Sequence, residues 1–307
     1  MRIAVTGASG FVGGHIALAL TRAGHTVYSY GRRAPTALTR RLPNYVSWDV
    51  ADGRIMAPSV DAVVHAAALV GDWGREKDYR AVNVDGTRAV LKTFADAGRF
   101  VLVSTTSVYS DGVVKCQVRE DASVGDCRHS AYARTKAEAE AIVRKARPDA
   151  VILRPHIVYG PGDTTLLPRL LGSRRFGVLP IPGDGSNTLS VTHLDNLVIA
   201  VMRAIEARNV SGTFNISDGK DASVEELLDT ILSRLVVPTN LVFVPRATAW
   251  AAAAVLEAMW MRGSATRGPY LTRYAVSQLA DEHTLDITHA REVLRYAPRW
   301  SYRDGPL

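Results

Sequence analysis

The amino-acid sequence predicts an α/β fold in which a doubly wound parallel sheet is joined to a smaller C-terminal α+β domain. Short apolar runs rich in β-branched residues alternate with longer helix-type segments through the first half of the chain, as in βαβ units. A turn rich in glycine follows the first apolar run and opens the first helical segment. With 307 residues, the chain can bury a sizeable core without disulfides or metal ions.

The individual elements follow from these patterns in chain order. Strands are predicted at residues 3–6, 26–30, 45–48, 62–65, 100–104 and 151–154. Helices are predicted at residues 10–23, 79–97 and 131–146, the last two rich in alanine and charged side chains. After Arg154 the pattern changes to loops rich in glycine and proline, and a strand and helix at residues 190–207 are expected to return to the sheet.

Charge and cysteine content limit which ligands, partners and cellular settings are expected. The 37 lysines and arginines exceed the 30 aspartates and glutamates by 7 but are spread along the chain, which favours small anionic ligands and predicts no nucleic-acid partner. Cys116 and Cys127 form neither a CxxC pair nor part of a metal-ligand cluster, so we expect no metal site and a reducing, cytoplasmic setting. Because residues 2–5 already have the pattern of a strand, we expect no signal-like leader.

The longest apolar run lies at residues 247–261 and carries Trp250 and Trp260. It is shorter than the roughly 20 residues that span a bilayer, and Glu257 interrupts it, so no membrane span is expected. We expect a buried helix or a lid over a binding site. A subunit interface or a helix lying on a membrane surface is the alternative, since Arg246 and Arg262 flank the run.

The glycine-rich turn predicts a binding site for the pyrophosphate of a dinucleotide. Its glycines allow a tight turn and a close approach of the backbone, and the helix that follows offers free N–H groups and the positive end of its dipole. Such turns are typical of Rossmann-type sheets, although glycines also occur in turns that bind nothing. The candidate contacts are Gly7, Ser9, Gly10, Phe11, Val12 and Gly13.

The end of the second strand predicts that NADP(H) is preferred and that NAD(H) remains possible. A site for NAD usually carries Asp or Glu there for the ribose hydroxyls, whereas this sequence has Gly31, Arg32 and Arg33. The glycine is expected to leave room for a 2′-phosphate, and two guanidiniums can pair with it. If both arginines are solvated loop charges instead, the preference stays open.

Tyr132 and Lys136 stand four residues apart on a predicted helix and therefore share one face. A phenol titrates near ~10, so its oxyanion becomes accessible near neutral pH only beside a cation such as a lysine. The pair is a candidate for proton transfer, although Tyr-xxx-Lys also arises by chance on surface helices.

Further motifs make the sequence resemble the extended short-chain dehydrogenase/reductases of the NAD-dependent epimerase/dehydratase superfamily over nearly its whole length. Each of them follows a strand or opens a helix. They are Trp48-Asp49-Val50, His65-Ala66-Ala67-Ala68, Asn83-Val84-Asp85-Gly86-Thr87, residues 103–109 and residues 154–163.

The resemblance implies a role for each matching residue. Thr105 would hydrogen-bond the reacting oxygen, Tyr132 would act as acid or base, and Lys136 would also hold the nicotinamide ribose. Further cofactor contacts would come from Asp49, Val50, Ala66, Ala67, Ala68, Asn83, Pro155, His156 and Val158. For Asp49, Asn83 and His156, a structural role as turn cap, helix start or core histidine is the alternative.

The resemblance also implies how the chain is divided. Residues 1–155 plus about 187–216 would form the Rossmann domain, and residues 156–186 plus 217–307 the substrate-binding domain. A homodimer through the helices at 79–97 and 131–146 would be the usual assembly.

Several loops resemble the branch that contains 3β-hydroxysteroid dehydrogenases and bacterial ketone reductases. They are residues 70–74, Arg154-Pro155-His156, the run at 247–261 and residues 269–273. The expected reaction interconverts a ketone and a secondary alcohol on a hydrophobic polyketide-, lipid- or steroid-like substrate, with reduction by NADPH preferred. The candidate substrate contacts are Trp73, Thr106, His156 and Leu189, although the tryptophan also suits ordinary packing.

Two other functions remain open. The first is a nucleotide-sugar epimerase, dehydratase or ketoreductase of the same superfamily. Such enzymes usually carry an arginine for the diphosphate where this sequence has Leu189, so Arg169, Arg174 or Arg175 would have to replace it. The second is a dinucleotide-sensing protein without turnover, against which the intact Tyr132 and Lys136 argue.

Overall fold

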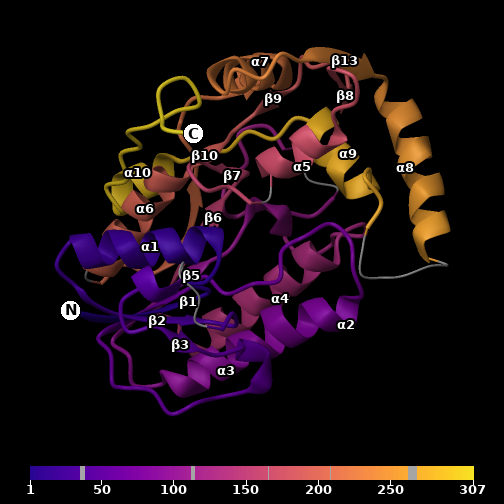
Figure 1. The fold of residues 1–307 in the computed structure, drawn as a ribbon. Helices are drawn as coiled ribbons and strands as arrows, with labels where there is room; N and C mark the ends of the chain where they lie inside the picture. The colour runs from indigo at the N-terminus through magenta and orange to yellow at the C-terminus, as the bar shows by residue number, and fades with distance from the viewer. Residues whose placement is uncertain (35–38, 112–114, 165, 208, 262–267) are drawn as a thin grey trace.

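The structure, a computed structural model, describes residues 1–34, 39–111, 115–164, 166–207, 209–261 and 268–307 (Figure 1). Its central sheet has seven parallel strands in the order β3–β2–β1–β4–β5–β6–β11. Their bounds are β1 Arg2–Thr6, β2 Thr26–Gly31, β3 Val46–Ser47, β4 Ala62–His65, β5 Arg99–Val103, β6 Val151–Pro155 and β11 Gly212–Ile216. The strand order reverses at β1, so the predicted doubly wound α/β fold is confirmed.

Helices cover both faces of this sheet (Figure 1). One face carries α1 (Phe11–Arg22), α6 (Leu194–Glu206) and α10 (Thr288–Val293), and the other carries α2 (Glu76–Tyr79), the π-helix η3 (Arg80–Asp85), α3 (Gly86–Thr93) and α4 (Ala131–Ala146). Successive residues of a strand point to opposite faces, so Ile3 and Val5 pack under α1 and α6 while Ala4 packs under α3 and α4.

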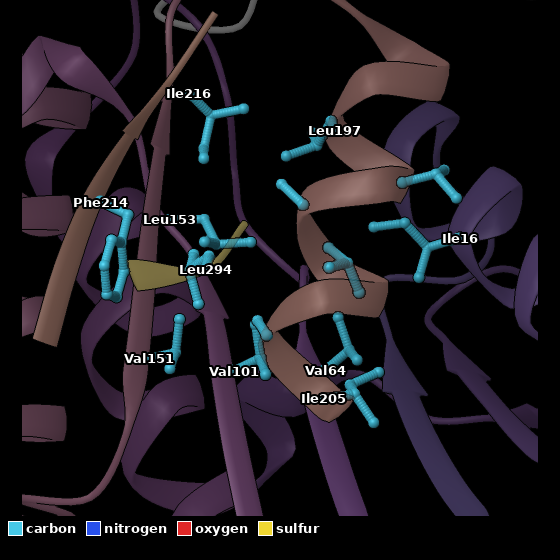
Figure 2. Close-up of a cluster of buried hydrophobic side chains, with 14 of the residues drawn as sticks. Ile16, Val64, Val101, Val151, Leu153, Leu197, Ile205, Phe214, Ile216 and Leu294 are labelled. Carbon is cyan, nitrogen blue, oxygen red and sulfur yellow. The ribbon is translucent and has the colours of Figure 1, made fainter. Parts of the chain in front are cut away.

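The core between α6 and the sheet is fully apolar. Figure 2 shows Ile205 of α6 beside Val64 and Val101, Leu197 further along the helix, and Ile16 of α1 on the other side of α6. At about 25 cal/mol per Å² of apolar surface, burial on this scale is the main stabilising term of the Rossmann part.

Two predicted elements differ from the observed ones. The helix expected at 79–97 begins at Glu76, widens into the π-helix and ends at Thr93. Of the passage at 190–207, the helix α6 does pack on the sheet, but its strand β10 (Thr192–His193) pairs with β7 (Val158–Tyr159). The strand that joins the sheet there is β11, whose residues from Gly212 onward pair with β6.

The C-terminal part is built from small sheets and helices above the carboxyl ends of the main strands (Figure 1). β9 (Thr188–Leu189) pairs antiparallel with β12 (Ala222–Ser223), and β8 (Val178–Pro182) pairs parallel with β13 (Asn240–Val244). The helices are α5 (Leu166–Ser173), α7 (Val224–Arg234), α8 (Arg246–Met261) and α9 (Arg273–Ala280). Short 3₁₀ turns lie at η1 (Thr39–Arg41), η2 (Val50–Asp52) and η4 (Thr106–Val108).

The apolar run at 247–261 forms α8, which packs on α9 along one face only. Ala249, Ala253 and Glu257 are buried, whereas Met259 and Met261 are largely exposed. Of the expected buried helix or lid, burial holds for one face only, and Ala249 and Ala252 of α8 border the cavity described below. Arg262 lies outside the described residues. Within the ranges that the structure describes, no helix is long and apolar enough to cross a membrane.

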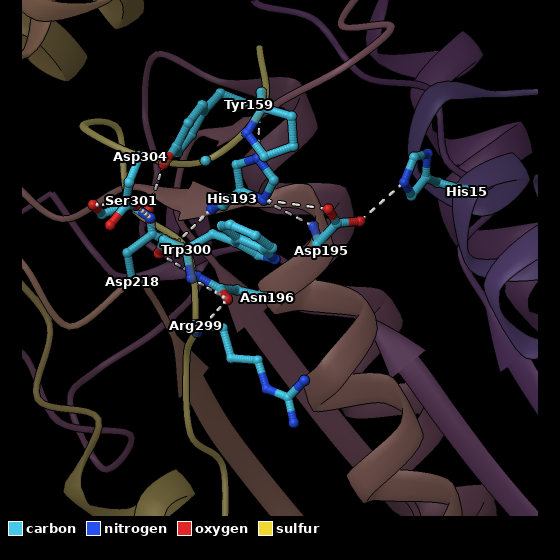
Figure 3. Close-up of polar contacts among 12 residues, drawn as sticks. His15, Tyr159, His193, Asp195, Asn196, Asp218, Arg299, Trp300, Ser301 and Asp304 are labelled. Atoms are coloured by element: carbon cyan, nitrogen blue, oxygen red, sulfur yellow. Dashed lines mark hydrogen bonds and ion pairs between the residues drawn. The ribbon is translucent and has the colours of Figure 1, made fainter. Parts of the chain in front are cut away.

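Residues 299–307, the C-terminal strap, are held against the start of α6 (Figure 3). The Asn196 Oδ1 accepts hydrogen bonds from the backbone N–H of Arg299 (2.8 Å) and Trp300 (3.1 Å). Its Nδ2 donates to the Trp300 carbonyl and to the Asp218 carboxylate, both at 2.7 Å. Asp218 is buried and also accepts from the Tyr159 hydroxyl at 2.7 Å, so the strap rests on a closed polar network.

The strap also reaches α7. Arg234, in the last turn of that helix, donates to the carbonyl of Tyr302 at 2.8 Å and to that of Gly305 at 2.6 Å. A cation at a helix C-terminus is favoured by the helix dipole, so Arg234 both ends α7 and fixes the strap to it.

Candidate active site

A single cavity of about 1140 Å³ runs from the glycine-rich turn after β1 to the space between α7, α8 and α9. It lies at the carboxyl ends of β1, β4, β5 and β6, where the order of the strands reverses. Ligands of open α/β sheets bind at this place.

The glycine-rich turn is shaped by close contacts that side chains would prevent. Gly7 has a φ of +74°, and an added Cβ would lie 2.7 Å from the backbone of Ala66 and Ala67 after β4. An added Cβ on Gly13 would lie 2.4 Å from the Gly7 carbonyl oxygen. The N-cap of α1 is Gly10, whose missing side chain leaves the first N–H groups of the helix open toward the cavity.

At the end of β2, Gly31 packs closely against the turn that follows β1. An added Cβ on Gly31 would lie 2.8 Å from the Ser9 backbone nitrogen, so this glycine, which borders the cavity, also makes room for Ser9. The Arg33 guanidinium donates to the Ser9 carbonyl at 3.0 Å, and Arg32 and Arg33 both border the cavity.

The candidate cofactor contacts that follow β3 and β4 line the cavity, with the exception of Asn83. Asp49 caps η2 by accepting from the Ala51 N–H at 3.0 Å, and Asp49, Val50, Ala66, Ala67 and Ala68 all border the space. Asn83 is buried and is not among the described residues that line it. Its side chain has a structural role, but not the expected one at a helix start, because Asn83 lies within the π-helix η3.

Asn83 ties the loop after β4 to α4. Its Oδ1 accepts from the Leu69 N–H at 2.8 Å, and its Nδ2 donates to the Leu69 carbonyl at 3.2 Å and to Thr135 Oγ1 at 3.0 Å. The residue sits in the π-helix, where the wider turn is a recurrent feature of functional regions.

Thr105, Tyr132 and Lys136 meet at the middle of the cavity. The helix α4 begins after Ser130, whose Oγ accepts from the Ala133 N–H at 3.1 Å, and this start places Tyr132 and Lys136 on the face toward β5. The Thr105 side chain lies close enough to the Tyr132 phenol to lower the pKa of that group. Lys136 donates from Nζ to the carbonyl of Val103 at 2.8 Å.

Burial governs the acid–base state of this group. It raises the pKa of Tyr132 to about 12, against the effect of the Thr105 side chain, which lowers it. The expectation of a phenol made acidic by Lys136 is therefore wrong for this structure. Burial also lowers the pKa of Lys136 to about 8, and the Glu140 carboxylate opposes that shift.

A buried ion pair lies one turn further along α4. Glu140 accepts from Arg154 Nη2 at 2.7 Å and from the Ser104 hydroxyl at 2.6 Å, and both charged side chains are almost fully buried. The Arg154 guanidinium also stacks 4.8 Å above the Tyr109 ring. Burial raises the pKa of Glu140, but the hydrogen bonds and charge of Arg154 outweigh it, so the pKa lies below its ordinary value.

Pro155, His156 and Val158 line the cavity after β6. His156 is buried, and its ring nitrogens lie 2.6 Å from the Ser190 carbonyl and 3.3 Å from Gln278 Oε1. Burial lowers its pKa, so the ring is neutral near physiological pH. His156 thus both borders the cavity and joins the end of β6 to α9.

The far half of the cavity is apolar. Leu189 belongs to its floor and is buried in a cluster with Leu179, Ile181 and Val224. Other apolar lining residues are Pro180, Pro182, Leu227, Leu228, Ile231, Val244, Ala249, Ala252, Leu271 and Leu279. Trp73 and Thr106 are not among the described residues that line the cavity. The structure therefore does not support the expectation that these two residues contact the substrate.

Ser107, Tyr274 and Gln278 are polar residues of the cavity that the sequence analysis missed. Ser107 follows Thr105 by two positions and could have been noticed within that motif. Tyr274 and Gln278 belong to α9, which the chain brings to the site from a distant segment, and no local pattern marks them.

Comparison with known proteins agrees with this geometry. The model of the family described as "NAD dependent epimerase/dehydratase family" matches residues 3–217. The chain belongs to this family. This protein is an NAD(P)-dependent enzyme of the extended short-chain dehydrogenase/reductase type, as the sequence motifs predicted.

Relatives over the full length of this epimerase/dehydratase-family enzyme include ketone reductases. A protein of Stenotrophomonas maltophilia named 2-alkyl-3-oxoalkanoate reductase is 32% identical, with 99% of this chain and 97% of that one covered. A Stigmatella aurantiaca protein named 4-hydroxy-2-methyl-3-oxo-4-farnesyl-3,4-dihydroquinoline-1-oxide ketoreductase is 29% identical, with 99% and 94% covered. These names support the predicted branch.

The fold is shared with solved structures. A UDP-glucuronic acid 4-epimerase from Bacillus cereus, solved with NAD, superposes with a TM-score of 0.75 at 24% identity, covering 99% of this chain and 96% of that one.

Proposed function

We propose that this enzyme reduces a ketone to a secondary alcohol on a hydrophobic lipid- or polyketide-like substrate, with NADPH as the reductant. One observation carries the proposal. Thr105 and Tyr132 stand where a glycine-lined end of the cavity, open to helix N–H groups, meets a far end with apolar walls. A reacting carbonyl at this junction would have the cofactor on one side and an alkyl chain on the other.

The residues of the near end fit a dinucleotide. Side chains at Gly7 and Gly13 would fill the turn, and the start of α1 offers unpaired N–H groups to a pyrophosphate. Bound NADPH would supply the hydride. The other proposed cofactor contacts are the candidate residues that border the cavity, which excludes Asn83.

The protein's own residues would handle the proton. The buried phenol of Tyr132 stays protonated over the ordinary pH range and would donate its proton to the developing alkoxide. The Thr105 hydroxyl would donate a second hydrogen bond to the same oxygen. Lys136, buried beside them, would hold the nicotinamide ribose and keep a positive charge near the reacting oxygen.

Arg32 and Arg33 support a preference for NADPH. Both border the adenine end of the cavity, and no carboxylate stands at the end of β2 to repel a 2′-phosphate. Arg33 would exchange its bond with the Ser9 carbonyl for a charge-assisted bond with the phosphate.

The apolar walls and the names of the relatives support a 3-oxo lipid as the substrate class. Leu227, Leu228 and Ile231 of α7 line the space beyond the reacting position, where an alkyl chain would lose its contact with water.

A nucleotide sugar is the second candidate, because Arg175 borders the cavity. Its Nη1 already donates to the carbonyl of Gly172 at 2.9 Å, and the position expected to hold a diphosphate arginine is filled by Leu189 in an apolar cluster. Arg174, a further candidate, donates to the Pro238 carbonyl at 2.5 Å. The side chain of Arg169 lies outside the described residues.

The proposal includes a cytoplasmic location, the division into Rossmann and substrate-binding parts, and a homodimer through α3 and α4. Cys116 and Cys127 are both free thiols, which suits a reducing compartment. Sedimentation at several concentrations would test the dimer.

The test combines cofactor titration with turnover. We expect NADPH to bind more tightly than NADH, and NADPH oxidation to depend on a medium-chain 3-oxo ester. Tyr132→Phe removes the proton donor but no cofactor contact of the near end, so it should lower kcat/KM by about 10²–10⁴-fold while the Kd for NADPH changes little.

Two outcomes would reject the proposal. Near-full activity of Tyr132→Phe would exclude this phenol as the acid. No turnover of any 3-oxo substrate, together with stabilisation of the wild type by UDP or dTDP, would favour the nucleotide-sugar candidate.

A further inference from the structure

A row of hydroxyl groups extends from the reacting position toward α9. Thr105 Oγ1, beside the Tyr132 phenol whose pKa it lowers, donates to Ser107 Oγ at 3.1 Å. Ser107 Oγ in turn lies 2.7 Å from the Tyr274 hydroxyl. All four residues border the same cavity, although Tyr274 comes from a segment far along the chain.

The row can present two separate donors to one ligand. When Tyr132 and Thr105 both donate to a ketone oxygen, Ser107 can donate to Tyr274, and the Tyr274 proton is then directed into the cavity. Burial raises the pKa of Tyr274, so this hydroxyl stays protonated and acts as a donor at every pH of ordinary use.

We propose that Tyr274, held by Ser107, is a specificity-determining residue that binds the second carbonyl oxygen of a 1,3-dicarbonyl substrate. The inference rests on the proposed ketone reduction and adds the group that would select among ketones. In a 1,3-dicarbonyl compound one carbon separates the two carbonyl carbons, so both oxygens can face the same row of hydroxyls. One oxygen is reduced beside Tyr132, and the other receives the proton of Tyr274.

The surroundings favour a hydrogen-bonded oxygen at this place. Leu271, Ala275 and Leu279 line the cavity around Tyr274 and offer an alkyl chain contact but no side-chain donor, while Gln278 on the same helix lies 3.3 Å from His156. A simple ketone would leave the Tyr274 hydroxyl facing these side chains without a ligand partner, and an unmade buried hydrogen bond is costly.

The experiment compares two substrates of equal chain length. Ethyl 3-oxooctanoate carries the second carbonyl, and undecan-6-one lacks it. Tyr274→Phe should lower kcat/KM for the ester by about tenfold, the cost of one lost hydrogen bond to a buried group, and that for the ketone by less than about threefold. Ser107→Ala should give a similar pattern, and the double variant should be no worse than either single one, because the two hydroxyls act as a unit.

The controls separate this inference from the proposed function. Tyr296→Phe removes another tyrosine hydroxyl, bonded to the Ser217 carbonyl at 2.9 Å outside the cavity, and should leave the ratio between the two substrates unchanged. NADPH affinity and melting temperature report folding of each variant. If the wild type reduces neither compound, the proposed function fails. If the wild type is active and Tyr274→Phe lowers both activities equally, or neither, the assignment of Tyr274 is overturned while the reductase stands.

Discussion

At the scale of single residues, Lys136 and Tyr132 have opposite pKa shifts from one cause. Burial favours the neutral form of each, so the phenol keeps its proton to about pH 12 and the lysine gives up its proton near pH 8. Alkaline loss of reductase activity should therefore report Lys136 rather than Tyr132.

We predict that kcat/KM for ketone reduction falls as pH rises through about 8, where Lys136 loses its charge. The Glu140 carboxylate raises the pKa of Lys136, so Glu140→Gln should move the midpoint of this fall to lower pH. Initial rates between pH 6 and pH 10 measure the effect. A profile that stays flat to pH 10 would contradict it, and melting curves identify any loss of folded Glu140→Gln, whose Arg154 would be left without its buried partner.

Residue identity allowed most of the near end of the cavity to be predicted. The glycines, Thr105, Tyr132 and Lys136 occur at fixed spacings within local motifs, and the structure brings them together. Trp73, Thr106 and Tyr274 could not be placed, because their distance from the cavity depends on how distant segments pack. The sequence predicted a role for Gly31 at the site, but its close approach to Ser9 is visible only in the folded turn.

At the scale of elements, the helical run from α2 to α3 shows why boundaries were harder to predict than strands. Hydrophobic spacing indicates a helix but does not distinguish an α-turn from the wider π-turn at Arg80–Asp85. Asn83 lies in that turn, and its side chain forms hydrogen bonds with Leu69 in the loop after β4. Similarly, β10 reads as a strand in sequence, and only its neighbours decide which sheet it joins.

We predict that Asn83→Ala loosens the loop after β4. The change leaves the backbone N–H of Leu69 without its partner and should lower the free energy of unfolding by about 2 kcal/mol. Because Ala66, Ala67 and Ala68 in this loop border the cavity, the Kd for NADPH should rise as well. Lys92→Ala, at an exposed position of α3, is the control, and equal effects of both changes on stability and Kd would refute the role of Asn83.

At the scale of the whole molecule, the C-terminal strap joins parts that are far apart in sequence. Asn196 uses both ends of its amide to hold the strap at the start of α6, and Arg234 holds it at the end of α7. This arrangement could not be predicted from the sequence, because an asparagine and an arginine on amphipathic helices are also typical of solvent-facing positions.

We predict that Asn196→Ala lowers the free energy of unfolding by about 3 kcal/mol, since the N–H groups of Arg299 and Trp300 lose their acceptor and the buried Asp218 loses a donor. Urea unfolding followed by tryptophan fluorescence measures the change. Asn240→Ala, at an exposed position of β13, should alter stability by less than about 0.5 kcal/mol. Indistinguishable unfolding of the two variants would argue against the strap as a structural tie.

The contact of the strap with α7 also bears on which substrates are accepted. Arg234 ends the helix whose Leu227, Leu228 and Ile231 form a wall of the cavity. The strap thus helps to position a wall that, in the proposed function, would contact the alkyl chain, at the opposite end of the cavity from the glycine-rich turn. Loss of the contacts of Arg234 with the strap should therefore weaken the discrimination between long and short substrates before it weakens nucleotide binding.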